Sequence, residues 1–346
     1  MNTDVCTSSA SKDELSFRSY DSWSVLKKTS RTFYLSISIL PKAPANALCL
    51  AYLLLRVSDF FEDSRFIDCD EKIRLLSTWD AILGGAEFPA RWRDSIAPSL
   101  GREADAIAAW YAEEILAEYR SLPRGLQSVI VTHVRNTTRG MIRWVKRGPH
   151  LHDEADLDDY MHEVAGRVGY LATEVFAWHS RSVRRVRSSL IPLARETGLA
   201  LQTVNVLRGI AEDAERGWSY IPEVYFEQEG LSRKAFLEPR NRELADRVVA
   251  RMIRKAERHL DAAVEYVRTV PRSVHRVRLA CIWPMMFAAR TVGLLREHPY
   301  DATNDVKMTR KDVRKIVRFT TVFGWSNLLV DRYFRSLMSS RSSLSS

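Results

Sequence analysis

The sequence is poor in cysteine, glycine and proline. Its four cysteines, Cys6, Cys49, Cys69 and Cys281, form no Cys-x-x-Cys pair, which argues against a disulfide framework and a zinc site and favours a reducing, cytoplasmic setting. The 14 glycines and 12 prolines in 346 residues are too few for the many tight turns of an all-β protein, but they suffice to separate helices. We therefore expect a mostly helical chain.

Long hydrophobic runs are also missing. The first 17 residues, MNTDVCTSSASKDELSF, contain no apolar core of the kind found in signal peptides. The longest nearly apolar stretch, 47–55, ends at Arg56 and is far shorter than the about 20 residues that cross a bilayer. The sequence therefore predicts neither a signal peptide nor a transmembrane helix.

Positive charge exceeds negative charge by a modest margin. With 52 Lys and Arg against 43 Asp and Glu, the formal net charge is +9, which favours an anionic partner such as nucleic acid, a membrane surface or a phosphorylated small molecule. The basic residues gather at 181–187, 233–258, 272–278 and 307–318, where acids or apolar residues at helical spacing interrupt them. Solvated helix faces are the better interpretation, so we expect no nucleic-acid partner.

The pattern of apolar residues predicts a single helical domain. A hydrophobic fraction of 46% is ample for a core, and from residue 22 onward apolar residues recur at helical spacing, as in Ile115, Tyr119 and Leu122. No strand-like alternation, internal repeat or Gly-rich linker divides the chain. We expect one all-α domain at 19–338, a disordered arm at 1–18 and a disordered Ser-rich tail at 339–346.

The first informative segment is Arg56-Val-Ser-Asp59-Phe-Phe-Glu62-Asp63, which continues the apolar run as a helix. Asp59 and Asp63 are four residues apart and so lie one turn apart on one face, with Glu62 beside them. Mg²⁺ prefers oxygen ligands and usually keeps several waters, so one or two carboxylates and phosphate oxygens can hold it. Arg56, one turn earlier, could contact the same phosphate. Taken alone, such a run is more often a solvated helix face.

A second acidic segment lies at 202–217. Asn205, Gly209 and Asp213 fall at i, i+4 and i+8 on one helix face, and Arg208 and Glu212 flank that face. Two acidic faces on separate helices, each with an arginine, indicate a cleft in which cations bridge a diphosphate between helices. Two unrelated surface turns are the alternative, which spacing alone leaves open.

Six ordered landmarks make the chain resemble the squalene and phytoene synthases. They are Ser30-Arg-Thr-Phe33, the 59–63 segment, Arg139-Gly-Met141, Tyr160-Met-His-Glu-Val-Ala-Gly-Arg-Val-Gly169, the 205–213 segment with Arg216-Gly-Trp-Ser-Tyr-Ile-Pro222, and Cys281-Ile-Trp-Pro284. The similarity runs from about residue 22 to residue 337. It implies one isoprenoid-synthase domain with a central cavity, in which magnesium-assisted loss of diphosphate from an allylic prenyl donor starts the reaction.

The resemblance also implies roles for individual residues. Asp59, Glu62 and Asp63 match the first aspartate-rich motif and Asn205, Glu212 and Asp213 the second, which together would hold two or three Mg²⁺ ions. Contacts to the diphosphate are expected from Ser30, Arg31, Arg56, Arg208 and Arg216. Tyr160 matches a tyrosine near the reacting carbocation that can help to remove a proton, and it is expected to be catalytic together with Asp59, Asp63 and Asp213. A core tyrosine with a satisfied hydroxyl is the alternative.

Two positions depart from the family pattern. The second motif normally reads N-x-x-R-D-x-x-E-D, but this chain has Gly209 in place of the first aspartate, and Arg167 stands where a small or apolar residue is usual. Two prenyl diphosphates, with about three negative charges each, need dense cation binding, so the lost carboxylate disfavours a second charged substrate. The vacated space could admit a neutral aromatic ring, and we expect an acceptor pocket formed by Gly209, Gly166, Arg167 and Phe60.

The leading hypothesis is therefore prenylation of an aromatic small molecule. The chain resembles squalene-synthase-like prenyltransferases of bacterial secondary metabolism, which alkylate carbazole-type aromatics with a short allylic diphosphate such as the dimethylallyl or geranyl compound. Candidates for cation–π contact, each of which is more simply a core aromatic, are Phe60, Phe61, Tyr34 and Trp178.

Two alternatives stay open. One is head-to-head condensation of two farnesyl diphosphates to presqualene diphosphate or squalene, for which alone NADPH would be required. The other is a non-catalytic binding or assembly protein with the same fold. Membrane contact is expected to be peripheral at most, because core packing of a last helix explains the amphipathic stretch 319–334 better.

Overall fold

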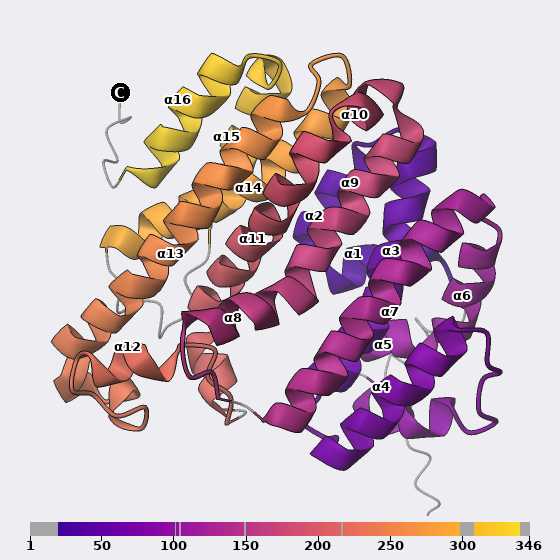
Figure 1. Cartoon of the computed structure of the whole chain (residues 1–346), viewed down its shortest axis with the longest axis horizontal. Coiled ribbons are helices and arrows are strands. Elements are labelled where there is room, and N and C mark those ends of the chain that lie inside the picture. Colours follow the sequence, from indigo (N-terminus) through magenta and orange to yellow (C-terminus); the bar gives the residue numbers. More distant parts are fainter. Residues whose placement is uncertain are drawn as a thin grey trace, which may run out of the picture.

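The computed structural model describes residues 20–100, 102–103, 105–148, 150–215, 217–297 and 308–339. The arm predicted at 1–18 and the tail beyond residue 339 lie outside this range. Within it, helices dominate, and the β-type pairing is limited to an isolated bridge between His150 and Ser219. The predicted all-α class is confirmed (Figure 1).

The chain forms long helices joined by short ones. The first half contains α1 (Ser22–Thr29), α2 (Arg31–Ser38), α3 (Lys42–Asp63), α4 (Cys69–Leu83), α5 (Ala106–Trp110), α6 (Ala112–Arg120), α7 (Arg124–Arg147) and α8 (Glu154–Met161). A π-helical turn, His162–Gly166, leads into α9 (Arg167–His179) and α10 (Arg181–Arg185). The second half contains α11 (Arg187–Glu215), α12 (Glu223–Glu227), α13 (Arg242–Thr269), α14 (His275–Glu297), α15 (Arg310–Phe323) and α16 (Asn327–Met338).

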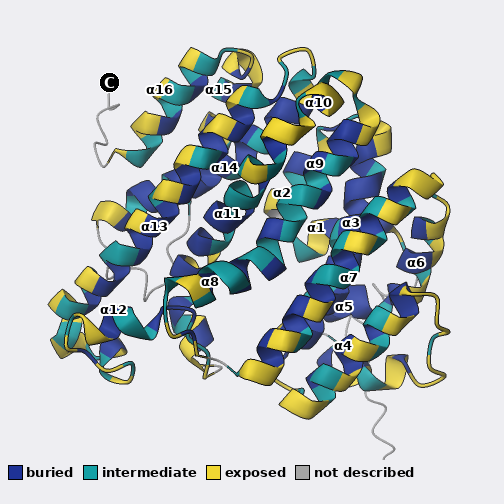
Figure 2. Ribbon diagram, viewed as in Figure 1, coloured by how far each residue is buried: buried dark blue, intermediate teal, exposed yellow. Residues whose placement is uncertain are grey.

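The helices form two groups around the middle of the molecule. On one side α3 packs on α4 and α7, and on the other α13 packs on α14 (Figure 1). Between them α11 contacts α8, α9, α13 and α14, so it is central to the bundle. Buried apolar side chains form a cluster in each group, and the faces turned inward are the buried ones (Figure 2).

Helix α3 positions its acidic last turn by burying almost everything before it. Leu54, Leu55 and Phe60 point in different directions around the helix, and each is buried. Burial on several sides fixes both the axis and the rotation of the helix. The carboxylates that follow in the last turn are therefore held in a defined direction.

Two glycines bring the π-helical turn and α9 into backbone contact with α11. A Cβ atom at Gly169 would lie 2.1 Å from the Ala194 carbonyl oxygen, and one at Gly198 would lie 2.3 Å from the Ala165 carbonyl oxygen. Only glycine permits this approach. The Val-Ala-Gly-Arg-Val-Gly landmark is thus explained by packing, and this packing sets Tyr160 and α11 around one cavity.

Within the described chain, α14 is long and apolar enough, by length and composition alone, to cross a membrane. Of its most apolar window, 78% is buried inside the molecule. The helix packs on α11, α13, α15 and α16. Buried core helices meet the same criterion, so these contacts account for its composition.

Candidate active site

A cavity of about 420 Å³ lies at the centre of the bundle, within the range of about 300–1,000 Å³ typical of small-molecule sites. Its lining follows α3 from Leu48 to Asp63 and α11 from Ala194 to Asp213. On both helices the apolar lining residues come first and the acids last. The cavity therefore has an apolar end and an acidic end.

The first acidic segment reaches the cavity as predicted. Arg56, Asp59, Glu62 and Asp63 all line its wall, and Glu62 is buried. Arg56 Nη1 lies 2.9 Å from Asp59 Oδ2, and Arg56 Nε lies 3.1 Å from a carboxylate oxygen of Asp105. The guanidinium also lies over the Tyr52 ring, 5.5 Å from its centroid. Arg56 is thus fixed between two carboxylates and an aromatic face.

The surroundings of Asp59 raise the pKa of its carboxyl group. Burial, followed by the negative charges of Asp63 and Asp105, raises the pKa of Asp59 to about 7, although Arg56 acts in the opposite direction. The ionised form is therefore disfavoured at this end of the cavity. A bound cation would relieve that penalty.

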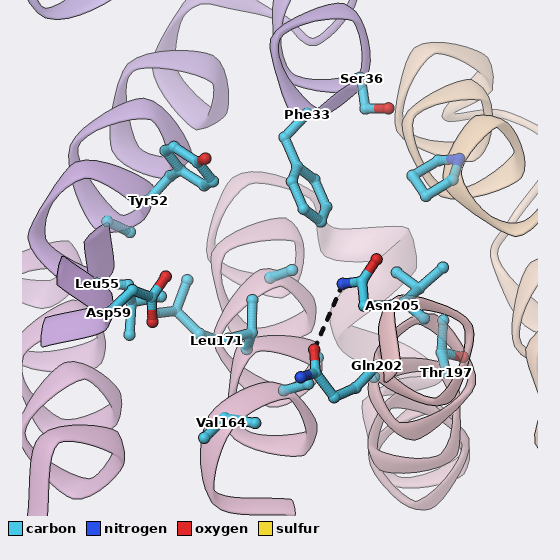
Figure 3. Close-up of a pocket in the computed structure, with 18 of the residues that line it drawn as sticks. Phe33, Ser36, Tyr52, Leu55, Asp59, Val164, Leu171, Thr197, Gln202 and Asn205 are labelled. Atoms are coloured by element: carbon cyan, nitrogen blue, oxygen red, sulfur yellow. Dashed lines mark hydrogen bonds between the residues drawn. The ribbon is translucent and has the colours of Figure 1, made fainter. Parts of the chain in front are cut away.

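The second acidic segment meets the first across the cavity. Asn205, Gly209 and Asp213 line the wall, with the Asp213 side chain buried. Asn205 Nδ2 donates to Gln202 Oε1 at 3.4 Å, and both amides lie across the cavity from Asp59 (Figure 3). The two acidic helix faces thus line one cavity, which excludes the alternative of two unrelated surface turns. Bridging of a diphosphate by cations between them stays a prediction.

Two residues of the second segment do not reach the wall. Arg208 is exposed, and the Glu212 side chain, 74% exposed, lies 3.3 Å from Arg65. Arg65 also lies 3.3 Å from Glu215 and so links the loop after α3 to the end of α11. Sequence analysis missed Arg65, because its partners are distant in sequence.

Of the other expected diphosphate contacts, Ser30 has a structural role, and the side chains of Arg31 and Arg216 are not described. Ser30 caps α2 by accepting a hydrogen bond from the Phe33 N–H at 3.1 Å and does not line the cavity. The Arg31 side chain and all of Arg216 lie outside the described residues. Their roles stay predictions.

Tyr160 lies at the end of α8 and lines the acidic end of the cavity. Its ring stacks on Tyr220 with a centroid distance of 4.7 Å, and Trp144 packs edge-on at 5.7 Å. Burial and then the charge of Glu62 raise the pKa of Tyr160 well above its ordinary value. The residue is placed as predicted, but its phenol stays protonated.

Part of the expected acceptor pocket is wrong. Gly209 lines the cavity, but Phe60, Gly166 and Arg167 do not. Phe60 is rotated about 100° from Asp59 on α3 and packs on Phe61 in the core. A Cβ at Gly166 would meet the side chains of His162 and Leu199, because Gly166 faces neighbouring helical residues. Arg167 Nε instead pairs with Glu163 at 2.6 Å.

The aromatic wall consists of other residues than those expected. Phe60 and Phe61 are core residues, Tyr34 packs on Trp23, and Trp178 is partly exposed. The aromatic residues that line the cavity are Phe33, Tyr52, Tyr160, Phe176, Tyr220 and Tyr266. Tyr52 could have been found, because it precedes Asp59 by seven residues and so shares its helix face.

The acidic end fits magnesium bridged by a substrate. In the described part of the chain, no three His, Cys, Asp or Glu side chains come close enough together to hold a metal unaided. Mg²⁺ usually takes one or two carboxylates and completes its shell with phosphate oxygens and water. Asp59 and Asp63 on α3 and Asp213 on α11 supply such ligands on facing walls, and the raised pKa of Asp59 is the electrostatic cost that a cation would remove.

Comparison with known proteins identifies the family. The squalene/phytoene synthase family model matches residues 26–315. Human squalene synthase is 28% identical over 287 residues, covering 82% of this chain but 64% of the human protein, so the chain spans less than two thirds of that relative. Botryococcus squalene synthase from Botryococcus braunii is 26% identical, with coverages of 85% and 61%.

Solved structures of this group share the fold. A ligand complex of TcSQS superposes with a TM-score of 0.77 at 23% identity, covering 97% of this chain and 94% of that one. A dehydrosqualene synthase bound to a ligand gives a TM-score of 0.62 at 17% identity, with coverages of 91% and 95%. Because the family model extends from α1 into α15, the chain belongs to the squalene/phytoene synthase family, whose members are prenyltransferases.

Proposed function

We propose that this protein is a Mg²⁺-dependent prenyltransferase that ionises one allylic prenyl diphosphate and transfers its prenyl group to a neutral aromatic molecule. The observation that carries the proposal is Gly209 on the cavity wall. A Cβ there would have Asp213 Oδ2 as its nearest neighbour, at 3.2 Å, so backbone packing does not require glycine. The missing carboxylate lowers the metal-binding capacity of the wall.

The small amount of positive charge on the cavity wall also favours a single headgroup. Among the side chains that the structure describes, Arg56 is the one Lys or Arg on the wall. Asp59 and Asp105 already neutralise much of its charge. Two headgroups with about three negative charges each would lie close together in this site, and their repulsion would have to be offset almost wholly by metal ions.

The chain's own groups divide the chemistry between the two ends. Asp59, Asp63, Asn205 and Asp213 would hold Mg²⁺, which neutralises the diphosphate as a leaving group when bound. Arg56 can donate hydrogen bonds to the same headgroup. As the allylic C–O bond breaks, the diphosphate keeps the electron pair. The faces of Tyr52 and the other wall aromatics then stabilise the cation and exclude water.

The acceptor ring attacks the allylic carbon, and a C–C bond forms. The ring carbon then loses its proton, which restores aromaticity. Because the pKa of Tyr160 is strongly raised, its phenolate is not available as a base, and the released diphosphate is the better proton acceptor. Tyr160 then acts as a neutral ring beside the cation.

A donor and acceptor matrix analysed by mass spectrometry tests this proposal. Dimethylallyl, geranyl and farnesyl diphosphates are each combined with carbazoles, indoles and phenols in the presence of Mg²⁺. We expect acceptor masses increased by one prenyl group, without any nicotinamide. Formation of a C30 hydrocarbon or presqualene diphosphate from farnesyl diphosphate, with no acceptor alkylated, would overturn the proposal.

Head-to-head condensation is the second candidate, and similarity to squalene synthases over 82% of the chain favours it. Only this reading would call for NADPH. Gly209→Asp separates the two candidates, with Gly209→Ala as the control for added volume. If the lost carboxylate suppresses C30 formation, Gly209→Asp raises the yield of C30 product and Gly209→Ala does not.

A non-catalytic role would require that the wild-type protein release no diphosphate from a prenyl donor. The Asp59→Ala variant gives the background rate of diphosphate release against which the wild type is compared.

A further inference from the structure

The corner between α15 and α16 exposes a group of apolar side chains. The exposed fractions are 59% for Val322, 38% for Phe323, 54% for Trp325 and 60% for Leu328. These four residues lie within seven positions, which we call the 322–328 corner. Exposed apolar groups of this kind mark interaction sites.

The corner is held rigidly by the core beneath it. Buried Arg278 of α14 donates to the Gly324 carbonyl oxygen at 3.2 Å, and Ser326 caps α16. Inward residues of the same two helices, such as Ile316 and Phe334, are buried. Core packing therefore explains one face of the 319–334 stretch, as expected, but leaves the outer face unexplained (Figure 2).

Basic residues extend from the corner along both helices. On α15, Lys311, Lys315 and Arg318 are exposed and share the face of Val322, because the spacings are four, three and four. On α16, Arg332 and Arg335 follow Leu328 at the same kind of spacing and are exposed.

The acids of these two helices cancel only part of this charge. Asp312 lies within the capping box of α15 and 3.6 Å from Arg290, and Asp331 pairs with Arg335 at 3.1 Å. The outer face of the two helices is therefore positively charged around an apolar tip.

We propose that the 322–328 corner and its basic flanks dock on a membrane surface that contains anionic lipid headgroups. An exposed tryptophan with aliphatic neighbours suits the boundary between headgroups and acyl chains, and flanking Lys and Arg add attraction to anionic lipids. A protein partner would have to match both the apolar tip and the basic flanks on two helices, whereas an anionic bilayer does so without a specific shape.

Helix α14 connects the corner to the cavity. Trp283 Nε1 donates to Thr320 Oγ1 at 3.0 Å, and His275 Nε2 lies 3.3 Å from the Thr321 carbonyl oxygen. Between and beside these residues, Cys281 and Pro284 line the apolar end of the cavity. Docking would thus hold the apolar end of the site near the lipid phase in which prenyl chains partition. This last step rests on the proposed function, whereas the docking surface does not.

Vesicle flotation tests the docking. The full-length protein is mixed with vesicles of phosphatidylcholine alone, or with about one third phosphatidylserine. We expect the wild type to float with the anionic vesicles and to be released by high salt. The double variant Trp325→Ser, Leu328→Ser should bind at least tenfold more weakly, and so should the triple charge reversal of Lys311, Lys315 and Arg318 to Glu.

Phe66→Ser is the matched control, because Phe66 is 56% exposed on a distant loop and its loss should leave flotation unchanged. Circular dichroism melting establishes that each variant is folded. The proposal is overturned if the wild type does not bind anionic vesicles, or if the double variant binds equally well. It is also overturned if light scattering finds that the double variant splits a dimer, because a second copy then covers the corner. None of these outcomes depends on turnover, so they are distinct from failure of the prenylation assay.

Discussion

At the scale of single residues, burial and neighbouring negative charge disfavour the ionised form of Asp59 at the acidic end of the cavity. Asp59 lies near Asp63 and Asp105, and Arg56 compensates for only part of the negative charge. Catalytic sites commonly contain such groups, because binding of the proper ligand relieves the penalty. In the metal-free protein, the cost of ionising Asp59 can be measured as a loss in the free energy of unfolding.

Asp59→Asn should stabilise the metal-free protein at high pH. The folded-state pKa of Asp59, about 7, lies above its ordinary value of 3.8, so the wild type loses stability as pH rises between these values. At pH 8 the variant should gain on the order of 1–2 kcal/mol in the free energy of unfolding, and near pH 4 almost nothing. Urea unfolding in EDTA at both pH values measures this, and an equal difference at the two values would contradict the assigned pKa.

At the scale of helices, the predicted landmarks combine chemical and packing roles. Arg139, in one landmark, lies with its Nε 3.1 Å from Asp80, and Arg135 binds the same carboxylate at 2.8 Å. These contacts join α7 to α4. A family landmark can therefore hold helices together without touching the cavity.

Asp80→Asn should weaken this connection. Although burial opposes it, hydrogen bonds from Arg135 and Arg139 lower the pKa of Asp80, so its stabilising effect is present at neutral pH and is lost as pH falls below its ordinary value of 3.8. We expect a loss of about 1–3 kcal/mol at pH 7. Thermal or urea unfolding across pH checks this, and a loss that persists undiminished near pH 2 would argue for a purely steric effect.

The glycines of α9 and α11 yield a matched pair of substitutions. Gly169→Ala forces a Cβ to within 2.1 Å of the Ala194 carbonyl oxygen and should cost about 1–3 kcal/mol or more. Gly209→Ala meets only the Asp213 side chain at 3.2 Å and should be neutral or up to about 1 kcal/mol stabilising. Melting temperatures of the two variants test the difference. Similar destabilisation by both would mean that Gly209 is needed for packing.

Periodicity within one helix could be predicted from the sequence, but contacts between helices could not. Asp59 and Asp63, like Asn205 and Asp213, share a face because of helix geometry alone. The errors at Gly166 and Arg167 arose because neither spacing nor composition specifies which neighbour a helix face meets. The same reason explains why Tyr220 was not assigned a role, although it belongs to a quoted landmark.

At the scale of the whole molecule, the two ends of the cavity differ in chemistry. Carboxylates from α3 and α11 meet at one end, and α14 forms part of the apolar other end, beneath the 322–328 corner. A donor would bind with its headgroup at the acidic end and its prenyl chain toward α14. The fold was predictable from ordered landmarks, whereas this polarity emerges only from the packing of the helices.

The central claim is that one diphosphate headgroup is held between α3 and α11. Isothermal titration calorimetry with a non-ionising thiodiphosphate analogue of farnesyl diphosphate and Mg²⁺ counts the headgroups bound per chain. This account predicts a single equivalent for the wild type. Two equivalents per chain, retained in Gly209→Ala, would contradict it.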